Sequence, residues 1–226
     1  MADATKHDEA PQTKGRTIRW WARFYDAASW LMSLGRAPEI RRMTLEMAAL
    51  RPGESVLDVG CGTGSLALAA KYALSAAEGE AAGPEGSVRG IDASPEMIEQ
   101  ARGKAAKRGA PVDFRVAPIE ELPFAEGEFD CVLSSFMLHH LPDEVKRAGL
   151  AEVRRVLKPG GRFLAVDFGS TSRSVTGHLL SILGHSHAHG ASLEALAPVL
   201  AEAGFTEVET GVTQYRSVAY LRGKAG

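Results

Sequence analysis

VLDVGCGTG, residues 56–64, is the stretch that decides the fold of this chain. A short apolar run reaches an acid, Asp58, and glycines follow at the alternate positions 60, 62 and 64. Glycine lets the backbone approach a ligand closely and adopt turns that a side chain disfavours. The apolar periodicity over residues 66–70 predicts a helix, so the loop joins a strand to a helix N-terminus. Backbone N–H groups at such a junction form a cradle for a ligand.

Asp58 bears on which ligand this cradle holds. Nicotinamide and flavin proteins use a glycine-rich loop to hold a diphosphate. A carboxylate two residues before the first glycine would repel a diphosphate in a site that partly excludes water. The same carboxylate suits a ligand with an ammonium group and no phosphate, and S-adenosylmethionine is such a ligand.

Composition bounds the class of protein. The 226 residues are 45% apolar and 24% charged, which is ordinary for one large globular domain. A net charge of −2 gives no global attraction to nucleic acid, so none is predicted as a partner. Two cysteines make no disulfide framework, the polar first fifteen residues are no signal peptide, and no apolar run approaches a membrane span. We therefore expect a cytoplasmic protein without a transmembrane segment.

Predicted strands and helices alternate along most of the chain. Strands are predicted at 55–59, 87–91, 112–116, 129–134 and 162–168, with a terminal hairpin at 205–212 and 214–221. Helices are predicted at 41–50, 65–74, 142–157 and 194–203, with another that begins at Pro95 behind the cap Ser94. Pro159-Gly160-Gly161 is predicted to turn the chain into the fifth strand. Such alternation predicts an α/β fold with a mostly parallel sheet covered on both faces, whose ligands bind at the carboxyl ends of the strands.

Three further segments have distinct compositions. Residues 1–15 are predicted to be a disordered leader, and 16–50 a helical segment that holds all three tryptophans of the chain. The remainder, 51–226, is predicted to be one domain. Residues 75–86 read as a flexible surface insertion, because they are small, acidic and glycine-containing.

Asp92 adds a second carboxylate at the same predicted edge of the sheet. It stands at the end of the second predicted strand, 28 residues beyond Gly64, where an acid accepts hydrogen bonds from both hydroxyls of a ribose. A nicotinamide enzyme would place an acid similarly, and an Asp beside the Ser94 cap has a structural alternative as well. Met97 and Ile98, one turn into the next helix, fit either an adenine face or the core.

Five ordered segments carry a family resemblance. They are VLDVGCGTG (56–64), GIDASPEMIEQA (90–101), IEELPF (119–124), FDCVLSSFMLHHL (129–141) and VRRVLKPGGRF (153–163). Together they resemble the class I S-adenosylmethionine-dependent methyltransferases, most closely the ubiquinone/menaquinone-biosynthesis-type subgroup. The resemblance implies a Rossmann-like, doubly wound sheet of seven strands, mostly parallel with an antiparallel terminal strand and helices on both faces.

The resemblance also implies the cofactor and its contacts. The methionine part of S-adenosyl-L-methionine would be held by Asp58, Gly60, Cys61, Gly62 and Thr63, and its ribose by Asp92. Its adenine would be held by Ala93, Met97, Pro118 and Ile119, and its methionyl end by Ser135. Pro118 departs from the family pattern, in which Asp or Asn precedes Ala. Because proline offers neither a side-chain acceptor nor an N–H, we expect adenine recognition to be weaker by about 0.5–1.5 kcal/mol.

Catalysis would need little beyond alignment, since the sulfonium is already activated. A carbon or oxygen acceptor also needs a base, and the candidates are His139, His140 and Tyr25. The alternatives are a structural loop role for the histidines and a core position for Tyr25. The resemblance also implies that the 16–50 segment, which includes Tyr25, folds over the cofactor as a lid. The run His185-Ser186-His187-Ala188-His189 is expected to be a pocket wall or surface loop rather than a metal site, because methyl transfer requires no metal.

Three functions remain distinguishable at this point. The first is in-line methyl transfer from S-adenosylmethionine to a small-molecule or lipid-like acceptor, with a homodimer as an open alternative to a monomer. The second is a non-catalytic, S-adenosylmethionine-binding regulatory homologue, which the departure at Pro118 keeps open. A nicotinamide-dependent oxidoreductase is the third, and Asp58 and the Leu-Lys-Pro-Gly-Gly stretch argue against it.

Overall fold

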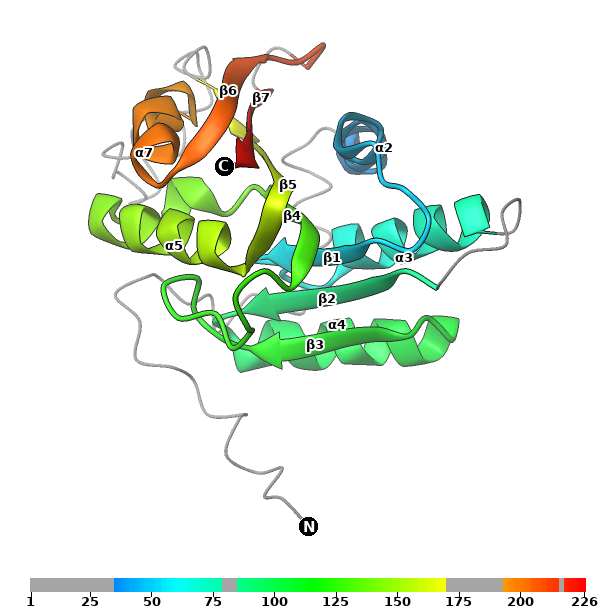
Figure 1. Cartoon of the computed structure of the whole chain (residues 1–226). Coiled ribbons are helices and arrows are strands. Elements are labelled where there is room, and N and C mark those ends of the chain that lie inside the picture. The colour runs from blue at the N-terminus through cyan, green and yellow to red at the C-terminus, as the bar shows by residue number, and fades with distance from the viewer. Residues whose placement is uncertain (1–34, 79–84, 170–192, 216–217) are drawn as a thin grey trace, which may run out of the picture.

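One mixed sheet organises the chain (Figure 1). The computed structural model describes residues 35–78, 85–169, 193–215 and 218–226. Its seven strands lie in the order β3-β2-β1-β4-β5-β7-β6. The strands are β1 (Ser55–Val59), β2 (Ser87–Asp92), β3 (Val112–Val116), β4 (Phe129–Ser135), β5 (Leu157–Phe168), β6 (Phe205–Val212) and β7 (Val218–Ala225).

Helices cover both faces of this sheet. They are α2 (Ala37–Ala48), α3 (Ser65–Glu78), α4 (Pro95–Arg108), η2 (Leu138–His140), α5 (Asp143–Val156), η4 (Leu193–Leu196) and α7 (Ala197–Glu202). One apolar core joins α2, α3 and α4 to one face, and a second joins α5, η4 and α7 to the other. The predicted doubly wound α/β architecture with helices on both faces is confirmed.

The strand order reverses next to β1. β1 pairs in parallel with β2 on one side and with β4 on the other, so Asp58 lies between Gly90 and Leu133. β7 is antiparallel to both β5 and β6, which makes it the antiparallel strand that the family resemblance predicted. A reversal of this kind leaves a crevice at the carboxyl ends of the central strands, where ligands of open α/β sheets bind. In Figure 1 these ends of β1, β2 and β3 point the same way.

Several predicted boundaries were wrong. β5 starts at Leu157 and not at 162, because Pro159-Gly160-Gly161 forms a bulge inside the strand, where the register jumps from Phe129/Leu157 to Cys131/Arg162. β7 runs over 218–225 and not 214–221, because Val218 pairs with Phe168 at the end of β5. The helix predicted at 41–50 is α2, which begins four residues earlier at Ala37 and ends at Ala48.

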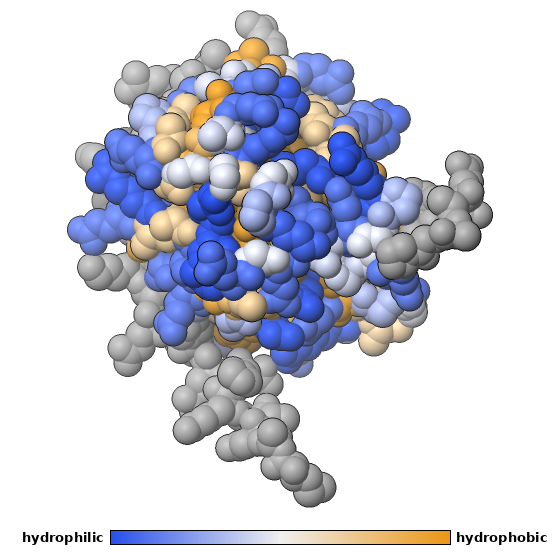
Figure 2. Space-filling model, viewed as in Figure 1, coloured by the Kyte–Doolittle hydropathy of each residue, from blue (hydrophilic) through white to orange (hydrophobic). Residues whose placement is uncertain are grey.

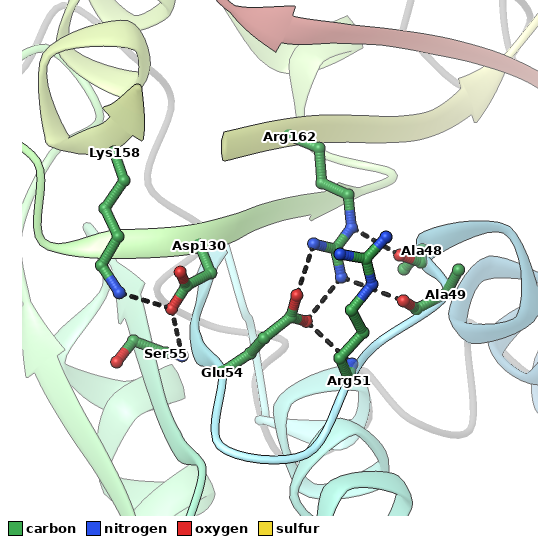
Figure 3. A network of polar contacts seen from close by, with 8 residues as sticks. All are labelled: Ala48, Ala49, Arg51, Glu54, Ser55, Asp130, Lys158 and Arg162. Atoms are coloured by element: carbon green, nitrogen blue, oxygen red, sulfur yellow. Dashed lines mark hydrogen bonds and ion pairs between the residues drawn. The ribbon is translucent and has the colours of Figure 1, made fainter. Parts of the chain in front are cut away.

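Polar contacts fasten the amino end of the sheet (Figure 3). Arg162 donates from Nε to the Ala48 carbonyl at 2.7 Å and from Nη2 to the Ala49 carbonyl at 3.1 Å, at the C-terminus of α2. Its two Nη atoms also bind the two carboxylate oxygens of Glu54 at 2.7 and 2.6 Å. Beside it, Asp130 accepts from Lys158 and from the Ser55 N–H. Side-chain contacts therefore occupy the amino ends of these strands, and the glycine loop lies at the opposite, carboxyl ends.

Some predictions fall outside the described residues. They are the leader, most of the 16–50 segment with Tyr25, the centre of the 75–86 insertion, and the histidine run at 185–189. None of the helices that the structure does describe is long and apolar enough to cross a bilayer. Hydrophilic residues cover most of the face shown in Figure 2, with apolar residues in small separate areas.

Candidate functional site

The glycine loop leaves β1 in a conformation that needs glycine. Gly60, Gly62 and Gly64 all have positive φ, at 71°, 52° and 77°. A Cβ on Gly60 would lie 2.3 Å from Cγ of Met137, and one on Gly64 would lie 2.6 Å from Cζ of Phe114. Positive φ and close approach thus both exclude side chains. The loop runs directly into the N-terminus of α3, as the sequence predicted.

Asp92 reaches from the end of β2 into this loop. Its Oδ2 accepts a hydrogen bond from the Gly62 N–H and its Oδ1 accepts one from the Ser94 N–H, each at 2.9 Å. Burial raises the pKa of the carboxyl above its ordinary value, against the two N–H donors, which lower it. Ser94 also caps α4 by accepting from the Met97 N–H at 3.3 Å. Asp92 is thus held beside the loop while its side chain stays partly exposed.

Asp58 lies beneath the loop rather than in front of it. The side chain is 1% exposed, and its Oδ2 accepts from the Ala67 N–H in the first turn of α3 at 3.0 Å. Burial raises the pKa of this carboxyl to about 7, with a further upward contribution from Asp92, while the Ala67 N–H opposes the shift. Asp58 here binds the helix start, and its contact with an ammonium group stays a prediction.

The other loop residues are also buried. Cys61 donates its N–H to the Ile91 carbonyl at 2.8 Å, which fastens the loop to β2. Burial, and then the neighbouring Asp58 and Asp92, raise the pKa of the Cys61 thiol well above its usual range, so the thiol stays protonated. Thr63 accepts from Lys104 Nζ at 2.7 Å, which joins the loop to α4.

The chain after β3 approaches the same edge. Ala117 donates its N–H to the Asp92 carbonyl at 3.1 Å, so Pro118 follows immediately beside the end of β2. The side chain of Ile119 turns into the core, where a Cβ on Gly149 of α5 would lie 2.7 Å from its Cγ1. Ala93 is half-buried, and Met97 is 3% exposed on α4.

The turn after β4 forms the other wall of the site. Ser135 is half-buried at the strand end, and Phe136 follows with φ of 52°, a conformation that few residues other than glycine adopt. Met137 then lies against Gly60. Two residues on, His139 Nδ1 contacts Asp167 Oδ1 at 2.6 Å, and the His139 N–H donates to Asp167 Oδ2 at 3.1 Å.

Asp167 and Met137 are residues that the sequence argument missed. Asp167 comes near the end of β5 and is 2% exposed, although the acid-ended apolar strand FLAVDF has the same form as the ends of β1 and β2. That repeated form was the available signal. No local pattern indicated the contact of Met137 with Gly60. His140 is exposed, and its ring centroid lies 3.8 Å from that of His139.

A small recess opens beside His139. Its lining is mainly apolar, with one buried ammonium and one buried carboxylate: Leu138, His139, Lys146, Asp167, Phe168, Leu193 and Leu196. Lys146 is 1% exposed, and its Nζ donates to Asp143 Oδ1 at 3.0 Å. The recess lies between the turn after β4, the end of β5 and the start of α5.

The site residues fit a ligand with a ribose and an ammonium group. Three positive-φ glycines keep a helix N-terminus free of side chains, and two carboxylates flank it within hydrogen-bonding distance of its backbone. A partly exposed carboxylate accepts hydroxyl donors, and both carboxylates favour positive charge over a diphosphate. Asp58, Asp92 and the glycine loop are thus brought together at the carboxyl ends of β1 and β2, whereas the side chain of Ile119 turns into the core.

Comparison with known proteins identifies similar chains. The methyltransferase domain family matches residues 56–161. The ubiquinone/menaquinone biosynthesis C-methyltransferase UbiE of Geobacter sp. (strain M21) is 36% identical over 153 residues, which cover 67% of this chain and 61% of that one. The protein of the same name from Bdellovibrio bacteriovorus is 30% identical over 175 residues, 77% of this chain and 70% of that one.

A solved structure supports the fold. Magnesium protoporphyrin IX methyltransferase (ChlM) from Synechocystis PCC 6803 with bound SAH matches with a TM-score of 0.62 and 19% identity, covering 93% of this chain and 89% of that one. In length, the chain spans only 52–61% of four curated relatives.

Proposed function

The chain belongs to the class I S-adenosylmethionine-dependent methyltransferases, and from that premise we propose that it methylates a small-molecule or lipid-like acceptor by in-line transfer. The observation that carries the proposal is the meeting of the glycine loop with Asp92. The Gly62 N–H and the Asp92 carboxylate lie 2.9 Å apart at the carboxyl edge of β1 and β2. Relatives named as ubiquinone/menaquinone biosynthesis C-methyltransferases support a small-molecule or lipid-like acceptor.

Each residue of the edge has a role in this proposal. Asp92 accepts from the ribose hydroxyls and gives up its bond to the Gly62 N–H as it does so. Asp58 supplies negative charge behind the loop for the ammonium group, and Gly60–Thr63 present backbone to the methionine part. Ala93, Met97, Pro118 and Ile119 border the adenine, and Ser135 borders the methionyl end.

The bound cofactor supplies an activated methyl group on a sulfonium. The chain then has to exclude water and align the acceptor behind that methyl group. Met137 and Phe136, in the turn after β4, are suited to shield the glycine loop. His139 and His140 follow in the same turn and are the candidate bases, while Tyr25 is proposed as a lid residue.

Calorimetric titration with S-adenosylmethionine and with NAD tests the cofactor. We expect the methyl donor alone to bind, and Asp92→Ala to weaken it at least tenfold, because charge-assisted hydrogen bonds contribute about 1.5–3 kcal/mol each. Ser94→Ala is the matched control, since it removes the cap of α4 and leaves the carboxylate in place. Binding of NAD without S-adenosylmethionine would refute the proposal, as would full affinity in Asp92→Ala.

A further inference from the structure

Asp167 fixes how the imidazole of His139 is presented. Its Oδ1 lies 2.6 Å from His139 Nδ1, and its Oδ2 accepts the backbone N–H of the same residue at 3.1 Å. The Phe168 N–H donates to Oδ1 at 2.7 Å and holds the carboxylate in place. A carboxylate bonded at Nδ1 keeps the proton there and leaves Nε2 to act as an acceptor.

Nε2 is available for a proton. It lies across the ring from Asp167, the His139 side chain is 30% exposed, and Nε2 has no hydrogen-bond partner within the described part of the chain. The Phe168 ring packs at the edge of the imidazole, with centroids 4.9 Å apart. Packing against Phe168 and the hydrogen bond of Nδ1 to Asp167 hold the ring in one orientation, and the backbone N–H bond to Asp167 fixes the residue that carries it.

The backbone of His139 lies close to the residue that covers the glycine loop. Met137 contacts Gly60, and His139 follows two residues later. Since consecutive Cα atoms are about 3.8 Å apart, the Cα of His139 is within about 8 Å of the Cα of the residue that covers the loop. The recess beside His139 is mainly apolar and small, with room for about one water molecule.

The charged groups around His139 come from four elements. Asp167 faces it from β5, and Lys146 of α5 lines the same recess. His140 stacks on it within η2. Glu194 of η4 lies beside the residue that follows β5, since its Oε1 is 3.2 Å from the position that a Cβ on Gly169 would take.

We propose that His139 and Asp167 form a general-base pair, with Asp167 as the positioning residue, and that the acceptor belongs to the phenol class. This inference rests on the proposed function above. His139 Nε2 takes the hydroxyl proton while the acceptor oxygen forms its bond to the methyl carbon. The carbon–sulfur bond breaks with its electron pair on sulfur, so the sulfonium becomes a neutral thioether and His139 becomes an imidazolium beside Asp167. An amine acceptor, already nucleophilic when neutral, would not need such a pair.

The test uses the full chain with radiolabelled S-adenosylmethionine and two matched probe sets, mono- and dihydric phenols and the anilines of the same ring pattern. We expect product from the phenols only. His139→Asn keeps an amide N–H at about the place of Nδ1 but lacks Nε2, so kcat should fall by about 10²–10⁴-fold. Asp167→Asn should lower kcat, because the imidazolium loses the carboxylate beside it, while KM for the methyl donor stays near the wild-type value.

Asp130→Asn is the control for a structural effect, because it removes the same charge at the opposite end of the sheet. Its kcat should match that of the wild type. Methylation of anilines alone, or of no probe by protein that binds the methyl donor, overturns the pair and its acceptor class. So does an Asp167→Asn variant whose kcat matches that of the wild type. Failure to bind S-adenosylmethionine refutes the proposed function instead, and titration separates the two results.

Discussion

Asp58→Asn is expected to stabilise the ligand-free protein above pH 7 while it weakens binding of the methyl donor. Burial raises the pKa of Asp58 from 3.8 to about 7, so the folded chain binds this proton more tightly than the unfolded chain does. The stability that the protonated group provides is complete below about pH 4 and is lost as pH rises through about 7. Asparagine stays neutral at every pH and keeps an oxygen that can accept from the Ala67 N–H.

The size of the effect follows from the shift. A displacement of about 3 pH units at about 1.4 kcal/mol each gives a ceiling of about 4 kcal/mol for the stability difference above pH 7. Since part of this difference is already present at pH 5, it should widen by about 2–3 kcal/mol between pH 5 and pH 8. Over the same range of pH, the affinity of Asp58→Asn for an ammonium ligand should fall relative to that of the wild type, because the variant has no negative charge at this position.

Urea denaturation of the ligand-free proteins at pH 5, 6, 7 and 8 measures the difference. Asp130→Asn is again the control: burial works against its carboxylate, but Lys158 and the Ser55 N–H outweigh burial and hold its pKa below the ordinary value. That variant should be destabilised by a nearly constant amount over pH 5–8. If the difference in free energy of unfolding between Asp58→Asn and the wild type stays constant with pH, or shrinks toward pH 8, the assignment of a buried, destabilising charge to Asp58 at the start of α3 is refuted.

Three further changes test other contacts of the site. Gly60→Ala should lower the free energy of unfolding, measured by urea denaturation, by about 1–3 kcal/mol, because φ is 71° at this residue and the added Cβ would meet Met137. Met137→Ala in the same chain should restore part of the loss. An unchanged denaturation midpoint for Gly60→Ala would contradict this. Arg162→Lys should lower the free energy of unfolding by about 1–3 kcal/mol, because an ammonium cannot bind Glu54 and the carbonyls of Ala48 and Ala49 in the planar geometry of a guanidinium. Arg147→Lys, at an exposed site on α5, should leave the stability unchanged. Equal effects of the two substitutions would show that the guanidinium geometry of Arg162 does not stabilise the fold. Pro118→Asp should tighten S-adenosylmethionine binding about threefold to tenfold by calorimetry, since it adds an acceptor for the adenine amino group, and unchanged affinity would separate residue 118 from the adenine.

Much of the fold could be predicted because local sequence and sheet pairing agree. The strands at 55–59, 112–116 and 205–212 were predicted to the residue, since Val, Phe or Thr recur in each and a proline or glycine turn precedes each. β5 and β7 were not, because their limits depend on partners far away in sequence. Pairing to β4 draws the proline–glycine segment of β5 into the sheet, and the end of β5 sets where β7 begins.

The features of the candidate site also fall into those that could be predicted from the sequence and those that could not. The glycine loop and Asp92 could be placed at one edge, because parallel strands bring their carboxyl ends together. The contacts of Met137 with Gly60 and of His139 with Asp167 could not, since each joins residues far apart in the sequence. For Asp58, the sequence indicated a ligand contact, whereas the structure shows the carboxylate bound to the start of its own following helix.

The position of β7 has a consequence for how the chain is assembled. β6 is made before β7, yet its only pairing among the described strands is to β7, which separates it from β5. During synthesis, β6 therefore emerges without a hydrogen-bonding partner, and β5 keeps an open edge until β7 arrives. Unpaired strand edges are sites of intermolecular association. Nascent chains that stop between β6 and β7 should thus aggregate, while chains that stop before β6 lack the two unpaired edges of β6.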